Sequence, residues 1–332
     1  MKYFVVTEDT IYNDIFCVMF QDAVNEGDTN IINKYVMTSN KILNKICSII
    51  YSRKFDSILK GKFDFILKKY FVLRNELKQS SEKSVVIFTN ASLQKFYNKR
   101  RLLEIKKEFS NNYFVLLLVD SSFQSQAQEA IRLSGENIFD LIYSYDKKDC
   151  EKYGYIYYPT PYSCLPIHKS IKKKDVYFCG AEKGRTDLLC QVARRLKNID
   201  IEYTFEVIGD SKNSNEFFQV SNSHPRKYTE ILKETLSHDC ILDLMQISKK
   251  SNMPGGLSLR VIESYAYKKR LISNNSQLLN FKYYDPSYMH YIETPDEIDP
   301  RWFQDPVLSN DMKNELTPIK FLENISNRLL YE

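Results

Sequence analysis

The sequence predicts the α/β fold class, with two doubly wound domains. At 332 residues, the chain exceeds the size at which a single hydrophobic core usually stops growing. Short apolar runs alternate with amphipathic helical patterns, which is typical of parallel sheets covered by helices. A proline-rich break separates two such series. Only nine Gly and ten Pro occur, so the composition indicates folded domains rather than a low-complexity chain.

The first series of alternating elements predicts an N-terminal domain over residues 1–165. Continuous apolar runs at 3–6, 84–88 and 113–119 are typical of strands that are covered on both faces of a parallel sheet. Between the last two runs, residues 92–109 repeat apolar side chains at a spacing of three to four, which predicts a crossover helix. Strand, helix and strand in this order form right-handed βαβ units.

Residues 41–78 interrupt this alternation. They contain ten Lys or Arg against three Asp or Glu, a local charge of +7 that exceeds the +5 of the whole chain. Aromatic and aliphatic residues run through the same segment, as in elements that lie on an anionic membrane surface. The more common alternative is a pair of solvated helices with an ordinary core face. We therefore expect a basic aromatic helical insert over about 40–80, with peripheral membrane contact as one interpretation.

A break over 153–166 precedes the second series. Its five tyrosines and three prolines make it too proline-rich for a helix and too interrupted for a central strand. A C-terminal domain is expected over 170–315, followed by a terminal helix with one apolar stripe over 318–331. The second series predicts strands at 176–179, 203–208, 240–244 and 270–273, and helices at 187–196, 228–236 and 258–267.

Several classes of function find no support in the motifs. Seven scattered cysteines without a Cys-x-x-Cys pair indicate reduced thiols, and four dispersed histidines give no metal-ligand spacing. The sequence contains no phosphate-binding Gly-x-x-x-x-Gly-Lys loop, Gly-x-Ser-x-Gly elbow or Gly-x-Gly-x-x-Gly turn. No apolar stretch approaches the roughly 20 residues that span a bilayer. We therefore expect a cytoplasmic protein without a bound metal.

Paired glycines come directly before one of the predicted helices. Gly255 and Gly256 would let a diphosphate approach the backbone, where the first helical N–H groups have no intrahelical partner and the helix dipole is positive. Ser258 can cap the helix or donate its hydroxyl, and Arg260 adds a charge-assisted hydrogen bond. Glu263 lies one turn further into the helix, where its carboxylate could accept hydrogen bonds from the ribose hydroxyls. A plain turn with a capping serine is the alternative for this motif alone.

A second cationic loop follows an earlier strand of the same domain. Gly180 makes the loop flexible, and Lys183 and Arg185 supply positive charge. Thr186 or the residue after it can cap the next helix. Both cationic loops come at the carboxyl ends of parallel strands, so together they predict a pyrophosphate site. The turn at Gly209 is a weaker third contributor.

Residues 256–275, GLSLRVIESYAYKKRLISNN, resemble the donor-binding element of GT-B glycosyltransferases, especially those of bacterial capsule and lipopolysaccharide gene clusters. Residues 176–185 are similar to the opening strand and basic loop of the same domain, and residues 139–149 to the exit from the first domain. The resemblance implies two Rossmann-like domains facing a cleft. It also implies a nucleoside diphosphate sugar as donor substrate, with no further cofactor, and a segment 316–332 that packs back toward the N-terminal domain.

The two loops and this resemblance together define the expected donor-binding residues. The resemblance places Arg260 and Lys183 or Arg185 at the diphosphate and Glu263 at the ribose. Many retaining members carry Glu-x7-Glu, but Gly255 occupies the first of these positions here, so the sugar and the stereochemical outcome do not carry over. The expected donor-binding residues are Gly180, Lys183, Arg185, Gly209, Gly255, Gly256, Leu257, Ser258, Arg260 and Glu263.

An inverting transfer would need a general base near the acceptor hydroxyl, supplied by the first domain. Asp120 directly follows the apolar run 113–119, and Glu8 or Asp9 follows the first run, so these carboxylates are the candidates. Each of them could instead be a helix cap or a turn residue.

The sequence thus predicts transfer of a sugar from a nucleoside diphosphate donor to a glycan or polyprenyl-linked acceptor. The resemblance places this reaction in surface polysaccharide synthesis, in the cytoplasm or at the inner face of the cytoplasmic membrane. A nucleotide-sugar epimerase of the same fold is one alternative. A basic membrane-binding or nucleic-acid-binding module built on residues 41–78 is another, but the modest overall charge and the lack of a recognition motif argue against nucleic acid as a partner.

Overall fold

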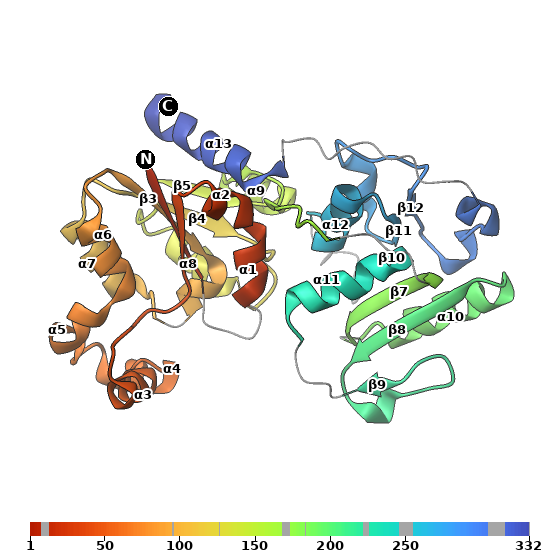
Figure 1. Cartoon of the computed structure of the whole chain (residues 1–332), viewed down its shortest axis with the longest axis horizontal. Coiled ribbons are helices and arrows are strands. Elements are labelled where there is room, and N and C mark those ends of the chain that lie inside the picture. The colour runs from red at the N-terminus through yellow and green to blue at the C-terminus, as the bar shows by residue number, and fades with distance from the viewer. Residues whose placement is uncertain are drawn as a thin grey trace. The chain divides into compact units, whose positions relative to one another are not determined.

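The computed structural model describes residues 1–7, 13–94, 96–125, 127–167, 173–182, 184–221, 226–245, 255–304 and 316–331. The chain divides into two compact units. Unit 1 comprises Met1–Ser163 with Leu316–Glu332, and unit 2 comprises Cys164–Glu315. Each unit contains a six-stranded sheet (Figure 1), and every pair of neighbouring strands is parallel. The predicted α/β fold class with two doubly wound sheets is therefore confirmed.

The sheet of unit 1 has the strand order β2-β1-β3-β4-β5-β6. The order reverses between β1 and β3, so the loops after these two strands lie at a topological switch point. β3 is buried along its whole length, as its continuous apolar run predicts. The strands are β1 (Lys2–Val6), β2 (Thr29–Ile32), β3 (Ser84–Thr89), β4 (Tyr113–Leu118), β5 (Leu141–Ser144) and β6 (Ile156–Tyr157).

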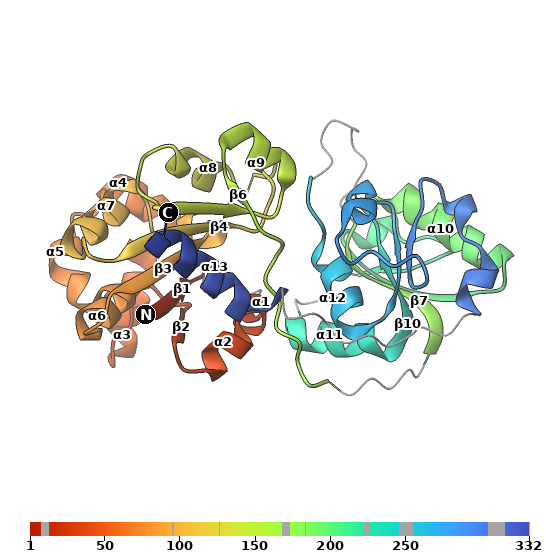
Figure 2. The same cartoon turned by 90° about the horizontal axis from the view of Figure 1, so that it is seen from above.

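Helices cover both faces of this sheet because alternate strand residues enter two separate cores. Val5 and Ile87 share a core with Phe321 and Ile325 of the terminal helix, which lies across the sheet in Figure 2. The neighbouring residues of the strands enter the other core, together with side chains of α3, α5, α6, α7 and α8. The helices are α1 (Asn13–Met19), α2 (Gln21–Asn25), α3 (Lys41–Ile50), α4 (Arg53–Leu59), α5 (Asp64–Leu67), α6 (Val72–Gln79), α7 (Lys99–Glu108), α8 (Gln128–Ser134), α9 (Lys147–Tyr153) and α13 (Pro318–Tyr331).

The crossover helix predicted over 92–109 is shorter than expected. It begins at Lys99, because the side chain of Asn98 caps it by accepting a hydrogen bond from the Arg101 N–H at 3.2 Å. Leu93 lies in a short 3₁₀ helix and Phe96 in a turn before α7, yet both are buried in the core. The helix-like spacing of apolar residues therefore extends beyond the helix, because the segment before it also buries its apolar side chains. The basic insert likewise forms four short helices, α3 to α6, rather than one pair.

The sheet of unit 2 has the order β12-β11-β10-β7-β8-β9 and reverses between β7 and β10. Helix α10 buries Leu189, Val192 and Leu196, spaced three and four residues apart, against this sheet. Right-handed crossovers in opposite directions place α10 and α12 on opposite faces. The elements are β7 (Lys173–Ala181), α10 (Thr186–Asn198), β8 (Glu202–Ile208), β9 (Val220–Ser221), α11 (Tyr228–Ser237), β10 (His238–Asp243), α12 (Leu259–Tyr267), β11 (Arg270–Ser273) and β12 (Met289–Tyr291).

Short 3₁₀ helices join several of these elements. They are η1 (Lys68–Tyr70), η2 (Asn90–Gln94), η3 (Ser211–Asn213), η5 (Ser276–Asn280), η6 (Pro295–Glu297) and η7 (Pro300–Phe303). Within the described part of the chain, no helix is both long enough and apolar enough to cross a membrane.

Candidate functional site

The candidate site lies where the strand order of unit 2 reverses. The loops that follow β7 and β10 leave neighbouring parallel strands at the same edge of the sheet. Each loop leads into a helix, β7 into α10 and β10 into α12, so two helix N-termini lie at this edge. Their unpaired N–H groups and positive dipole ends favour an anion.

Arg260, in the first turn of α12, reaches across from β10 to β7. Its Nη2 donates a hydrogen bond to the carbonyl oxygen of Cys179, which lies two residues before the end of β7. Its Nη1 lies 3.6 Å from Asp243 Oδ1, and its guanidinium lies 5.4 Å from the centroid of the Phe178 ring. These contacts hold the cation over the edge of the sheet.

Arg185, directly before α10, makes the reverse connection. Its Nη1 donates to the Leu244 carbonyl oxygen at 2.7 Å, just after β10, and its guanidinium lies 5.7 Å from the same Phe178 ring. Burial and the nearby charge of Arg260 lower the pKa of Arg185, while Asp243 partly opposes them. The structure therefore brings together the two arginines that the sequence assigned to one diphosphate. Lys183, the third predicted cation, lies outside the described residues.

Three buried polar atoms at this site find no hydrogen-bond partner among the described residues: Arg185 Nε, Asp243 Oδ1 and Ser258 Oγ. Asp243 Oδ1 is an ion-pair partner of Arg260, whereas Arg185 Nε and Ser258 Oγ have no such contact within the described ranges. Leaving a buried donor unsatisfied costs about 1–3 kcal/mol. Ser258 occupies the N-cap position of α12, but its side chain makes no capping hydrogen bond. The alternative of a turn with a capping serine thus holds for the backbone position of Ser258 but not for its side chain.

Gly180 leaves the space that Arg260 occupies. A Cβ at this position would lie 2.9 Å from Arg260 Nη2 and 3.2 Å from Phe178 Cζ. Before α12, the buried Gly255 and Gly256 form a bend, and Asn275 Nδ2 donates to the Gly256 carbonyl oxygen at 2.9 Å. The adjacent Leu257 is also buried, and it anchors the start of α12.

Gly209 leaves space for the carboxylate of Glu182, and its role in donor binding stays a prediction. A Cβ there would lie 2.7 Å from Glu182 Oε2. Glu182 accepts hydrogen bonds from Asn213 Nδ2 and, at 2.7 Å, from Thr186 Oγ1. The hydroxyl of Thr186 is thus engaged by Glu182, and Arg185 takes the N-cap position that was predicted for Thr186 or its neighbour. The loop after β7 is held in shape by its own polar contacts.

Glu263 lies beneath the site on α12 and is only 6% exposed. Its Oε1 accepts a hydrogen bond from the Tyr228 hydroxyl at 2.6 Å. Burial raises the pKa of Glu263 to about 7, although the Tyr228 hydrogen bond and the Arg260 charge pull it down. Its assignment to the ribose stays a prediction, because in this structure its carboxyl group is bound to Tyr228.

Of the expected base residues, the structure describes only Asp120 in unit 1. Asp120 is partly exposed just after β4, and its Oδ2 accepts a hydrogen bond from Asn90 Nδ2 at 2.8 Å. Asn90 Oδ1 in turn accepts from the Val119 N–H at 2.9 Å. Glu8 and Asp9 lie outside the described residues. Across the described ranges, no group of three or more His, Cys, Asp or Glu side chains could hold a metal ion.

Three residues that were not predicted, Phe178, Tyr228 and Asp243, contact the predicted site residues. Asp243 had a usable signal, because it is an acidic residue at the end of the apolar run that forms β10. No sequence signal identified Phe178 or Tyr228, since the apolar patterns of β7 and α11 predict only that these side chains are buried.

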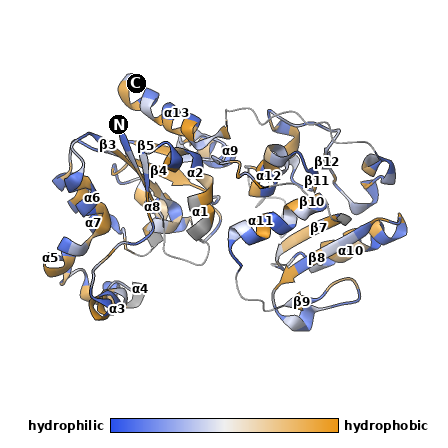
Figure 3. Cartoon of the chain, viewed as in Figure 1, coloured by the Kyte–Doolittle hydropathy of each residue, from blue (hydrophilic) through white to orange (hydrophobic). Residues whose placement is uncertain are grey.

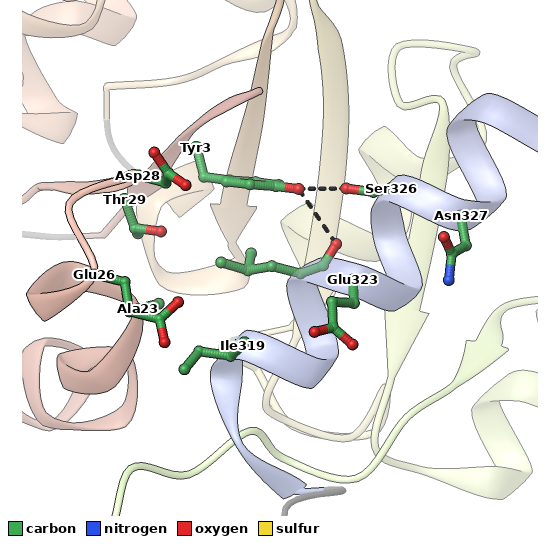
Figure 4. A pocket seen from close by; sticks show the side chains of 10 residues that line it. Tyr3, Ala23, Glu26, Asp28, Thr29, Ile319, Glu323, Ser326 and Asn327 are labelled. Carbon is green, nitrogen blue, oxygen red and sulfur yellow. Dashed lines mark hydrogen bonds between the residues drawn. The ribbon is translucent and has the colours of Figure 1, made fainter.

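A separate pocket of about 390 Å³ lies in unit 1, between α13 and the first residues of β1 and β2 (Figure 4). At its wall, the Tyr3 hydroxyl hydrogen-bonds to Ser326 Oγ. Its lining includes the carboxylates of Glu26, Asp28 and Glu323 but no Lys or Arg. Like charges repel, so this lining disfavours a diphosphate, and the pocket is not a candidate for the predicted donor site.

No protein-family model matches the sequence, and no curated protein matches it. Several solved structures do. They include the glycosyltransferase VinC in complex with dTDP, with 10% identity, a TM-score of 0.37, and coverage of 99% of this chain and 94% of that chain. The spinosyn rhamnosyltransferase SpnG gives 8% identity, a TM-score of 0.41, and coverage of 92% and 88%. A glycosyltransferase from Rickettsia africae ESF-5 has 10% identity and a TM-score of 0.45, and the match covers 100% of this chain and 99% of that chain.

Proposed function

We propose that this chain is a glycosyltransferase that binds a nucleoside diphosphate sugar at the switch point of unit 2. One observation carries the proposal. The guanidinium groups of Arg185 and Arg260 both lie near the Phe178 ring, and within the described ranges the buried Arg185 Nε and the Ser258 hydroxyl find no hydrogen-bond partner. A diphosphate supplies the negative charge and the acceptor oxygens that these groups lack.

The chemistry of sugar transfer fits such a site. As the glycosidic bond to the donor breaks, negative charge develops on the leaving diphosphate. Fixed cations and helix N-termini stabilise that charge without needing a metal ion, and one such donor typically contributes about 10²–10³ in kcat. Arg185, Arg260 and the Ser258 hydroxyl would bind the phosphate oxygens here. Metal independence is accordingly part of the proposal.

The remaining assignments follow the sequence. Lys183 would add a further cation, Gly255 and Gly256 would allow close approach of the phosphates, and Glu263 would meet the ribose. Asp120, or Glu8, would act as general base for a sugar hydroxyl of the acceptor. The resemblance of residues 256–275 supports a glycan or polyprenyl-linked acceptor in surface polysaccharide synthesis, at the cytoplasmic side of the membrane.

A thermal-shift screen tests the proposal. The chain is heated with UDP, GDP, CDP, dTDP and their sugars, and one nucleotide should raise the melting temperature, by an amount that corresponds to about 2.7 kcal/mol at a concentration 100 times Kd. Arg260→Ala should abolish this shift. Arg301→Ala is the matched control, since that arginine is 84% exposed in unit 2 and forms an ion pair with Asp299, away from the predicted site residues.

Two outcomes would overturn the proposal: no nucleotide stabilises the chain, or Arg260→Ala leaves the shift intact. Product analysis then separates the enzyme classes. A transferase leaves the nucleotide sugar unchanged when no acceptor is present, apart from slow hydrolysis. An epimerase would convert it to a second nucleotide sugar.

A further inference from the structure

Exposed large apolar side chains are concentrated in one segment of unit 1, residues 37–66. Among the described residues, seventeen large apolar side chains are exposed, and nine of them fall between residues 37 and 66. An exposed apolar cluster of this kind usually marks a binding surface. The nine are Met37, Ile42, Ile46, Ile49, Phe55, Ile58, Phe63, Phe65 and Ile66.

Helix α3 shows that these side chains are not needed for the core. Its inner side buries Cys47 in the core of unit 1. Ile42, Ile46 and Ile49, spaced four and three residues apart, form a second stripe that is 73%, 45% and 48% exposed. Lysines flank this outer stripe, and Figure 3 shows apolar and polar residues mixed along α3 and α5.

The positive charge of the same region is turned outward. Two of its three carboxylates face inward, where the buried Arg101 of α7 donates to both Asp56 and Asp64. Arg100 also pairs with Asp64. In the described part of the chain, six exposed lysines of the region make no salt bridge: Lys41, Lys45, Lys60, Lys62, Lys68 and Lys69. The outer surface is therefore both apolar and strongly cationic.

We propose that the exposed residues of α3, α4 and α5 form a docking surface for an anionic lipid bilayer. The outer isoleucines and phenylalanines would enter the boundary between headgroups and acyl chains, while the lysines meet anionic headgroups. A protein partner fits less well, because lysine is depleted in the buried parts of protein interfaces. A nucleic acid would leave the isoleucine stripe in water. The surface shares no residue with the donor site, so it can be tested independently of the proposed sugar transfer.

Vesicle co-sedimentation of the full chain tests this surface. Vesicles of phosphatidylcholine with about one third phosphatidylglycerol should bind the chain at least tenfold more tightly than phosphatidylcholine alone, and raising the salt to about 1 M should weaken binding. The triple variant Ile42→Ser, Ile46→Ser, Ile49→Ser should lose roughly tenfold in binding. Leu279→Ser, at an apolar side chain that is 50% exposed in unit 2, should bind as the wild type does.

Charge reversal provides a second test that leaves the apolar stripe intact. Lys41→Glu with Lys45→Glu should lower vesicle binding about tenfold, whereas Lys197→Glu with Lys233→Glu, at exposed lysines of unit 2, should not. Nucleotide-induced thermal shifts should be unchanged in all four variants. Equal binding to neutral and anionic vesicles, or no loss in both α3 variants, would overturn the proposal. So would a change in oligomeric state in the α3 variants without wild-type lipid binding, which would make the surface an interface between copies.

Discussion

Replacing Glu263 with Gln should remove a pH dependence from the stability of unit 2. Burial raises the pKa of this carboxyl group from 4.5 to about 7 in the folded chain. The folded state thus holds the proton more tightly than the unfolded state does. The resulting stabilisation is complete below the unfolded pKa and is lost as the pH rises through the folded pKa. The gap between the two pKa values corresponds to about 3 kcal/mol.

Glutamine keeps the shape of the protonated acid and can still accept the hydrogen bond from the Tyr228 hydroxyl. At about pH 4 the variant and the wild type should therefore unfold with similar free energies. At about pH 8 the variant should be more stable by up to about 3 kcal/mol, because the wild type then carries a buried charge.

Urea unfolding followed by tryptophan fluorescence measures this effect. Trp302 is the single tryptophan of the chain and lies in unit 2, so its emission reports on the unit that contains Glu263. Glu230→Gln, at an exposed glutamate of α11, is the matched control and should follow the wild type at both pH values. If the curves of wild type and Glu263→Gln stay parallel from pH 4 to 8, the reasoning about this buried carboxyl group is refuted.

Two further substitutions test the packing around the site and the docking surface. Gly180→Ala would place a Cβ 2.9 Å from Arg260 Nη2, so calorimetric titration should show at least tenfold weaker nucleotide binding with little change in unfolding. Unchanged affinity would show that Arg260 is not held by this glycine. Arg101→Met leaves Asp56 and Asp64 without their buried cation, and unit 1 should lose about 3–5 kcal/mol in thermal unfolding. A loss below about 1 kcal/mol would mean that these carboxylates relax into water.

Much of the fold was predictable because its signals are local. The apolar runs and stripes identify β11 at Arg270–Ser273 and α13 at Pro318–Tyr331, with the bounds that the structure has. The meeting of Arg185 and Arg260 was also predictable, because the carboxyl ends of parallel strands share one edge of a sheet. The start of α7 was not, since the turn before it buries apolar side chains as a helix would.

Which residues contact each other across neighbouring strands depends on the register of strand pairing, and the apolar pattern of one strand does not predict that register. Pairing of β10 with β11 sets Asp243 opposite Ser273, whose hydroxyl donates to Asp243 Oδ2 at 2.8 Å. That contact leaves Asp243 Oδ1 facing Arg260. In the same way, the contact of Asp120 with Asn90 follows from the pairing of β3 with β4. The types of residue at the site could be predicted, but not which atoms are left without partners.

A crystal structure of the chain grown with UDP or dTDP would test the central claim most directly. The account predicts diphosphate oxygens within hydrogen-bond distance of Arg185 Nε, Ser258 Oγ and the Arg260 guanidinium, at the N-termini of α10 and α12. A diphosphate bound elsewhere, with Arg185 Nε and Ser258 Oγ still lacking a ligand, would contradict it.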